Sequence, residues 1–190
     1  MDYTAKVTEE LLHSPYEITK RADFDSFWEK ALDGIKGKPL EAERKKIKFF
    51  SPYIDVYDVS YLGADETRIH GWFLVPAFLR KDTYPCLLHY HGFCGSRGDP
   101  MDFLHWVMIG YCVLSVDCRS QGGITGDAHC YSSGLITNVT SQGILDKDDY
   151  YFKYLYLDAV RAIDFASSLP EVEKRIVVAE GSSQGGALSL

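Results

Sequence analysis

The amino-acid sequence predicts an α/β fold built on a doubly wound, mostly parallel sheet. Three short and nearly continuous apolar runs, at residues 86–90, 111–116 and 175–179, are typical of strands covered on both faces. Helical patterns separate these runs, one from about residue 100 and one over residues 154–168. The alternation of strand and helix along the chain is the pattern of a parallel sheet with helices on its faces.

The first third of the chain predicts a helix and a hairpin. Asp23 can cap a helix over residues 24–35, whose apolar residues recur at helical spacing and predict one buried face. Residues 54–62 and 67–75 are β-branched and aromatic, and the four residues between them can form a reversal. Residues 122–151 are rich in Gly, Ser, Thr and Asp, so we expect a long excursion over the carboxyl edge of the sheet, where ligands bind in such folds.

Composition limits the possible partners. The 190 residues are 46% hydrophobic, which predicts one globular domain with its own core, and the net charge of −7 disfavours nucleic acid and anionic membranes as partners. Residues 1–12 lack the apolar run of a signal peptide, and no stretch is long enough to span a bilayer, so we expect a cytoplasmic protein. The five cysteines are odd in number and lack paired C-x-x-C spacing, so we expect reduced thiols, no metal and no cofactor.

A Gly-x-Ser-x-Gly sequence follows directly on the third apolar run. It reads Gly181-Ser182-Ser183-Gln184-Gly185, and the residues after it can open a helix. This strand, turn and helix context is that of a nucleophile elbow, in which flanking glycines allow a strained turn and the helix N-terminus favours negative charge. Only Ser183 lies two residues from both glycines, so Ser183 is the predicted nucleophile. The alternative is a small-residue turn without chemistry.

His91-Gly92-Phe93 follows the first apolar run, where an elbow enzyme places the loop that supplies one oxyanion-hole amide. The backbone N–H groups of Phe93 and Gln184 are therefore the predicted donors to the oxyanion of a tetrahedral intermediate. We interpret His91 as a buried residue that ties down this loop, and His89 either as a core residue or as one that supports the residues of the site.

Five further sequence blocks accompany the two motifs above: Asp23-Phe24-Asp25-Ser26-Phe27-Trp28, Ile69-His70-Gly71-Trp72, Arg119-Ser120-Gln121-Gly122, Gly143-Ile144-Leu145-Asp146 and Asp158-Ala159-Val160-Arg161-Ala162. With these blocks the chain resembles the acetyl xylan esterase and cephalosporin-C deacetylase family of α/β-hydrolases. The resemblance implies the α/β-hydrolase fold and removal of acetyl groups from small acetylated sugars or cephalosporin-like esters, through an acyl-serine intermediate without a metal. It also implies a cytoplasmic oligomer, usually a hexamer.

Two positions depart from the family pattern. Ser120 replaces the glycine of an Arg-Gly-Gln motif, and we expect strain there if the glycine has a positive φ. Phe93 replaces a tyrosine, which removes a hydroxyl but keeps the backbone N–H. We interpret Arg119 as a buried arginine that binds carbonyls beneath the site, and the order Ser, Asp or Glu, His of this fold argues against Asp117 as the catalytic acid.

All six histidines precede Ser183, and only seven residues follow it. We therefore expect residues 1–190 to be the N-terminal part of one α/β-hydrolase domain, truncated after the nucleophile elbow, with the catalytic Asp and His beyond residue 190. Without them the serine would be a weak nucleophile, and the last strand would expose an unpaired apolar edge. Two alternatives stay open: a degenerate, non-catalytic protein with this fold, or another α/β-hydrolase such as a peptidase or lipase relative.

Overall fold

The computed structural model describes residues 3–14, 19–134 and 138–190, in two compact units, Met1–Gly34 and Ile35–Leu190. The first unit contains α1 (Tyr3–His13) and α2 (Phe24–Asp33). The predicted helix after Asp23 is present. Within this unit none of its residues is fully buried, and Phe27, Trp28 and Ala31 of the predicted apolar stripe are half-buried.

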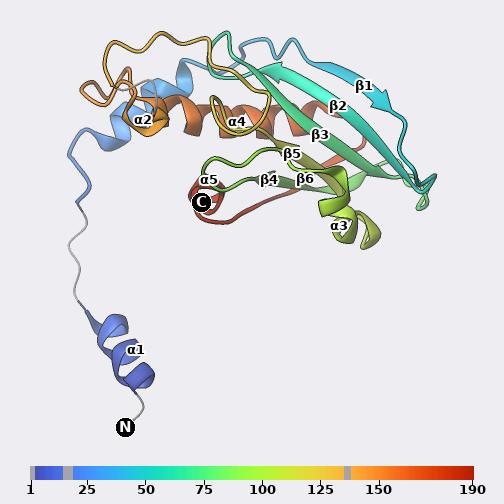
Figure 1. Ribbon diagram of the computed structural model, residues 1–190, viewed down its shortest axis with the longest axis horizontal. Helices are drawn as coiled ribbons and strands as arrows, with labels where there is room; N and C mark the ends of the chain where they lie inside the picture. Colours follow the sequence, from blue (N-terminus) through green and yellow to red (C-terminus); the bar gives the residue numbers. More distant parts are fainter. Residues whose placement is uncertain (1–2, 15–18, 135–137) are drawn as a thin grey trace. The chain divides into compact units, whose positions relative to one another are not determined.

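The second unit is organised around a six-stranded mixed sheet with the strand order β1-β2-β3-β5-β4-β6. Figure 1 shows the long β2–β3 hairpin beside the shorter inner strands. The strands are β1 (Glu43–Ile47), β2 (Ile54–Leu62), β3 (Arg68–Pro76), β4 (Tyr84–Tyr90), β5 (Cys112–Val116) and β6 (Val172–Gly181).

The sheet has an antiparallel half and a parallel half. Strands β1, β2 and β3 pair in antiparallel order, and β3 is also antiparallel to β5. Strand β4 lies between β5 and β6 and is parallel to both. The predicted hairpin and the three predicted parallel strands are therefore confirmed. Strand β1 was not predicted, because its sequence, Glu-Arg-Lys-Lys-Ile, is charged and it lies at an exposed edge of the sheet.

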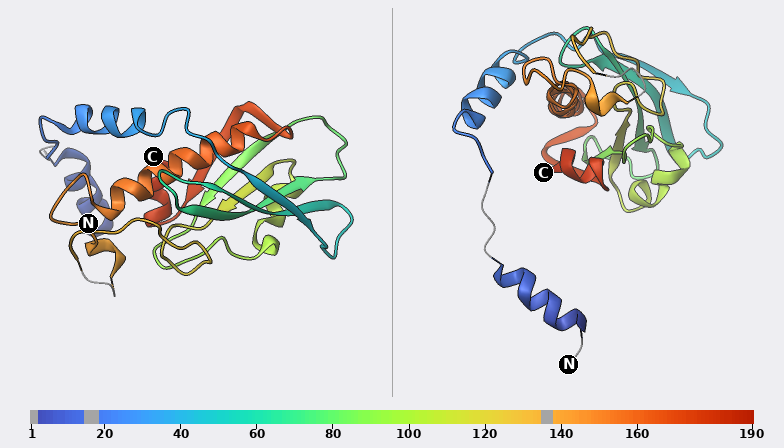
Figure 2. Two further views of the ribbon diagram at one scale, coloured as in Figure 1. Left: turned by 90° about the horizontal axis from the view of Figure 1, so that it is seen from above. Right: turned by 60° about the vertical axis from the view of Figure 1, so that its left-hand side comes forward.

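Helices cover both faces of the sheet, which confirms the doubly wound arrangement. Helix α4 (Tyr151–Ser168) packs on one face in a cluster with Cys86 and Leu88, and the 3₁₀ turn η1 (Pro100–Phe103) with α3 (Leu104–Met108) packs on the other, in a cluster with Leu87. Successive strand residues point to opposite faces, so this alternation places the two clusters on opposite sides. The right-hand view of Figure 2 shows α4, in orange, nearly end-on beside the sheet.

Strand β6 lies at the edge of the described sheet and leads into the short helix α5 (Gln184–Ser189). Ile176 and Val178 on this strand are 47% and 43% exposed. The exposed apolar edge that we expected from the sequence is therefore present along β6. An edge of this kind is able to pair with a further strand.

In the segment between β5 and α4, the described residues form little regular structure beyond the 3₁₀ turn η2 (Val139–Ser141), and residues 135–137 lie outside the description. It begins at the carboxyl end of β5 and contacts the β2–β3 hairpin, where Thr125 Oγ1 accepts from His70 N (2.9 Å) and Thr67 Oγ1 accepts from Ala128 N (3.0 Å). The predicted long excursion is confirmed.

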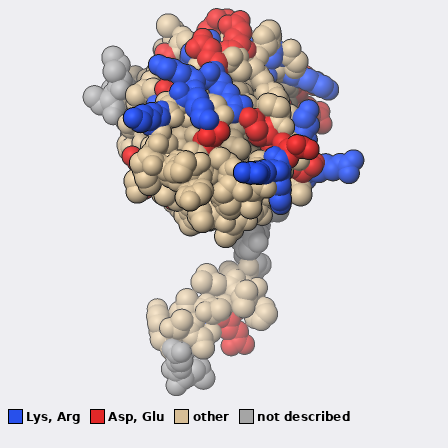
Figure 3. All heavy atoms as spheres, turned by 90° about the vertical axis from the view of Figure 1, so that its right-hand side faces the viewer, with Lys and Arg blue, Asp and Glu red and all other residues tan. Residues whose placement is uncertain are grey.

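Charged side chains of both signs are interspersed over the face of the molecule drawn in Figure 3. Ion pairs join charged side chains of the second unit, such as Arg44 and Glu171, whose Nη2 and Oε1 atoms are 2.6 Å apart. Within the described ranges, no helix combines the length and the apolar character that are needed to cross a lipid bilayer.

Candidate active site

The register between β4 and β6 brings two loops together at the carboxyl edge of the sheet. Tyr90 is paired with Gly181 in this parallel ladder. The residues that follow each of them, 91–93 and 182–184, therefore leave the sheet side by side. A Cβ atom added to Gly92 would lie 3.6 Å from Ser182 O and 3.9 Å from Ser183 Cβ, so the two loops lie close together at the predicted nucleophile.

Ser183 lies in a strained turn between the end of β6 and the start of α5. Its φ and ψ are 54° and −122°, a positive φ that a residue with a side chain rarely adopts. The flanking glycines are needed because backbone atoms crowd both: a Cβ on Gly181 would be 2.5 Å from Tyr90 O, and one on Gly185 would overlap the same carbonyl. Ser183 itself is exposed to solvent. This geometry is that of a nucleophile elbow.

Phe93 and Gln184, the predicted oxyanion donors, flank this turn. Gln184 is the first residue of α5, so its N–H has no partner within the helix. Phe93 is 48% exposed, and the N–H groups of both residues make no hydrogen bond to another group in the described part of the chain. Neither amide is therefore committed to a partner among these residues.

A pair of glutamines joins the two loops, which the sequence reasoning missed. Gln121 Nε2 donates to Gln184 Oε1 (3.0 Å) and to Tyr151 OH (2.9 Å), while Gln121 Oε1 accepts from Cys94 N (2.9 Å). The side chain therefore contacts the loop after β4 and the first residue of α5 at once. The sequence places Gln121 in the Arg119-Ser120-Gln121 block, but it gives no indication that the Gln121 side chain binds Gln184.

His91 is 5% exposed, and both of its ring nitrogens are bound. Nδ1 is 2.7 Å from Gly92 O, and Nε2 accepts from Cys118 N at 2.9 Å. Burial lowers the pKa of His91, which favours the neutral ring that these partners require. The structure agrees with our interpretation of His91 as a residue that holds the loop.

His89 points to the face of the sheet that η1 and α3 cover. Its Nδ1 atom lies 2.6 Å from Glu180 Oε2 on the neighbouring strand, and its ring packs beside Phe103, with ring centroids 5.0 Å apart. It belongs to the packing of the sheet, as interpreted from the sequence.

Arg119 is fully buried beneath the site, but its partners are carboxylates. Its Nε donates to Asp158 Oδ2 (2.6 Å), its Nη1 to Asp127 Oδ1 (3.0 Å) and its Nη2 to Asp65 Oδ1 (3.2 Å). The expectation of carbonyl partners is wrong, because a guanidinium in a low-dielectric interior is compensated best by opposite charge. The following residue, Ser120, has a φ of 51°, so the expected strain at this position is confirmed.

The Asp117 carboxylate accepts hydrogen bonds from three backbone N–H groups. It accepts from Arg97 N (2.6 Å), Ile124 N (2.9 Å) and Thr125 N (3.3 Å). Asp117 therefore fastens the loop after β4 to the excursion, which agrees with its exclusion as the catalytic acid.

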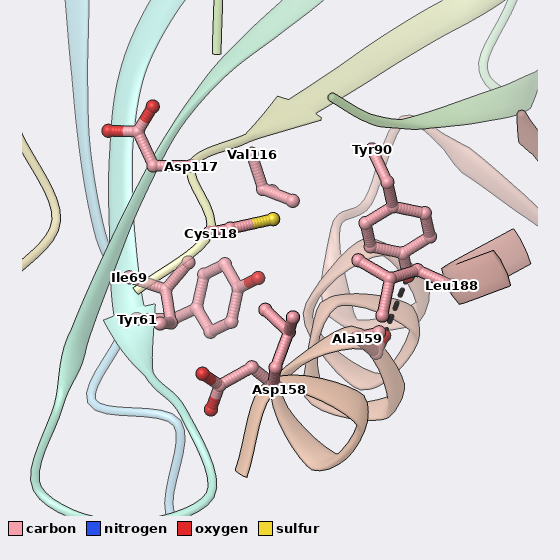
Figure 4. A pocket seen from close by; sticks show the side chains of 10 residues that line it. Tyr61, Ile69, Tyr90, Val116, Asp117, Cys118, Asp158, Ala159 and Leu188 are labelled. Carbon is pink, nitrogen blue, oxygen red and sulfur yellow. Dashed lines mark hydrogen bonds between the residues drawn. The ribbon is translucent and has the colours of Figure 1, made fainter. Parts of the chain in front are cut away.

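A cavity of about 10 Å³ lies in the core below the site, and Figure 4 shows its lining. The Tyr90 hydroxyl donates to Ala159 O (2.7 Å) at its wall, and the buried Tyr61 hydroxyl has no partner within the described residues. A space of this size holds at most one water, so an organic substrate cannot bind there.

A search of the described residues finds no group of three or more His, Cys, Asp and Glu side chains placed to hold a metal ion.

Comparison with known proteins gives one consistent result. A family model described as acetyl xylan esterase (AXE1) matches residues 2–190. The acetyl esterase Axe7A of Xylanibacter ruminicola is 31% identical over 179 residues. The acetyl xylan esterase from Paenibacillus sp. R4 superposes with a TM-score of 0.90 at 40% identity over 95% of this chain. Acetyl xylan esterase 1 from Thermoanaerobacterium sp. JW/SL YS485 superposes with a TM-score of 0.83 at 30% identity over 88%.

The matched proteins are longer than this chain. The match covers 88% of this chain but only 39% of the Xylanibacter protein. It covers 58% of the Paenibacillus chain and 53% of the Thermoanaerobacterium chain.

Proposed function

We propose that this chain, which belongs to the acetyl xylan esterase family, hydrolyses acetyl esters of carbohydrates through an acyl-Ser183 intermediate. The family match over residues 2–190 supports the substrate class. The single observation that supports the mechanism is the strained turn at Ser183, which exposes the residue between two loops.

The reaction begins with attack of Ser183 Oγ on the acetyl carbonyl carbon. The carbonyl oxygen becomes an oxyanion, and the N–H groups of Phe93 and Gln184 are proposed to stabilise it. Breakage of the ester C–O bond releases the sugar hydroxyl and leaves acetyl-Ser183, which water then hydrolyses to acetate and free serine. No metal has a part in these steps.

The serine proton needs a base. His91 has both ring nitrogens engaged, so it is not placed to accept this proton. The ring of His89 packs beside Phe103, on the face of the sheet that η1 and α3 cover. We propose that the base is a histidine which follows Ser183 in the complete domain, after an Asp or Glu, because this is the chain order of the fold.

The test is hydrolysis of p-nitrophenyl acetate and of acetylated xylo-oligosaccharides by the full-length protein. A burst of p-nitrophenol is expected, because an acyl-enzyme accumulates when its hydrolysis is slower than its formation. Ser183→Ala should abolish the burst and turnover. Ser182→Ala is the matched control and should retain both, since Ser182 contributes its backbone carbonyl to Gly185 N (2.9 Å) and that group is unchanged.

Unchanged turnover in Ser183→Ala would refute the mechanism. Cephalosporin C, a long-chain p-nitrophenyl ester and a peptide substrate serve as competitors. Preference for the long-chain ester or the peptide over the acetylated sugar would refute the substrate class in favour of a lipase or peptidase relative.

A further inference from the structure

The peptide unit between Gly92 and Phe93 is held through its carbonyl. Gly92 O lies 2.7 Å from His91 Nδ1 and also accepts from Gly95 N at 2.9 Å. A trans peptide is planar, and its C=O and N–H bonds point in opposite directions. Two donors that fix the direction of the Gly92 carbonyl therefore also fix the direction of the Phe93 N–H.

The imidazole that supplies one of these donors is itself anchored. Cys118 N donates to His91 Nε2 at 2.9 Å, just after β5 ends. Since Nε2 accepts a hydrogen bond, it carries no proton, and in a neutral ring the proton must be on Nδ1. This tautomer is the one that can donate to Gly92 O. The ring thus forms a bridge from the end of β5 to the loop that follows β4.

We propose that His91, as the neutral Nδ1–H tautomer, is a positioning residue that directs the Phe93 N–H toward the oxyanion. The proposal rests on the proposed function above. His91 does not touch the substrate in this scheme. It acts through the Gly92–Phe93 peptide, which lies beside Ser183, since a Cβ added to Gly92 would be 3.9 Å from Ser183 Cβ.

Two isosteric variants separate this role from a general structural role. In His91→Asn, the side-chain amide nitrogen occupies the place of Nδ1 and can still donate to Gly92 O. In His91→Gln, the amide oxygen can reach the place of Nε2 and accept from Cys118 N, but the donor to Gly92 O is lost. Each variant keeps one of the two hydrogen bonds.

The expected result is a difference in kcat between the two variants. Removal of one oxyanion donor lowers kcat by about 10²–10³-fold, so misdirection of that donor in His91→Gln should lower it by roughly 10–100-fold. KM should change little, because the interaction forms in the transition state. His91→Asn should recover most of the wild-type kcat. Equal kcat values in the two variants, or a larger loss in His91→Asn, would overturn the proposal.

A second measurement needs neither activity nor a variant that folds. Long-range ¹⁵N–¹H NMR of the wild-type protein reports which ring nitrogen of His91 is protonated. A protonated Nδ1 and an unprotonated Nε2 support the proposal, whereas a protonated Nε2 overturns it. Turnover that survives in Ser183→Ala would refute the proposed function, while the tautomer would still be decided by the spectrum.

Discussion

The backbone carbonyl of Tyr90 occupies the space that a side chain on Gly185 would need. Tyr90 is the last residue of β4, and Gly185 lies in the first turn of α5. Gly185 does not have a positive φ, so its backbone conformation does not require a glycine. A glycine is needed there because β4 and α5 approach each other too closely for a side chain. The close approach brings the loop after β4 against Ser183.

Gly185→Ala should therefore destabilise the fold by about 3 kcal/mol, because the new methyl group would force a strand and a helix apart. Urea denaturation measures the change. Gly126→Ala is the matched control, since a Cβ at Gly126 would have no atom within 4 Å. Equal unfolding midpoints for the two variants would contradict the packing argument.

Ser120→Gly should stabilise the protein by about 1 kcal/mol, because glycine adopts a positive φ without strain. Part of the gain is lost, since glycine also has more conformational freedom in the unfolded chain. Ser120→Ala is the control, since alanine retains the strain at a φ of 51°. Thermal unfolding of the two variants checks this. A higher melting temperature for the alanine variant than for the glycine variant would show that the strain is not a cost.

Arg119→Met should cost about 3–5 kcal/mol, because it leaves three buried or partly buried carboxylates without their shared cation. Arg21→Met removes an arginine whose side chain is 89% exposed and should have almost no effect. Denaturant titration compares the two. A small loss in Arg119→Met would mean that the carboxylates become protonated at little cost.

The excursion should loosen in acid through Asp149. Hydrogen bonds from the side chains of Ser132 and His129, and from the Ser132 backbone, lower the pKa of Asp149 to about 2. The pKa of Asp149 in the folded protein is lower than its pKa of about 3.9 in the unfolded chain. The contribution of Asp149 to the free energy of unfolding is therefore complete above the unfolded pKa and is lost as the pH falls toward about 2.

In Asp149→Asn, the free energy of unfolding should therefore fall less steeply than in the wild type as the pH decreases from about 5 to 2, the acid limb of the stability profile. Chemical denaturation at several pH values measures this limb, and Asp82→Asn, at an exposed position, is the control. An acid limb in Asp149→Asn as steep as that of the wild type would exclude this carboxylate as its origin.

The sequence was sufficient where the constraint is local. Apolar runs marked β4, β5 and β6, and the glycine spacing of residues 181–185 placed Ser183 at a strand-to-helix turn, because strand, turn and helix preferences act over a few residues. It was insufficient at β1, where the charged sequence gives no strand pattern and pairing with β2 decides the structure.

Within the site, the contacts that could not be predicted join residues far apart in the chain. Gln121 binds Gln184, and Arg119 binds carboxylates from three separate segments. A sequence reveals which residue types are present, but such pairs depend on how the sheet brings its loops together. The role of Ser183, Gln184 and Phe93 in catalysis remains a prediction that the kinetic experiments test.

The Arg119 cluster also has a consequence for the order of folding. Its carboxylates come from positions 65, 127 and 158, so the cluster closes only after the hairpin, the excursion and α4 have all assembled. Contacts of long sequence separation carry a high loop-closure cost and tend to form late. Loss of the guanidinium should then raise the unfolding rate constant more than it lowers the refolding rate constant. The Arg119 side chain therefore prolongs the lifetime of the native state.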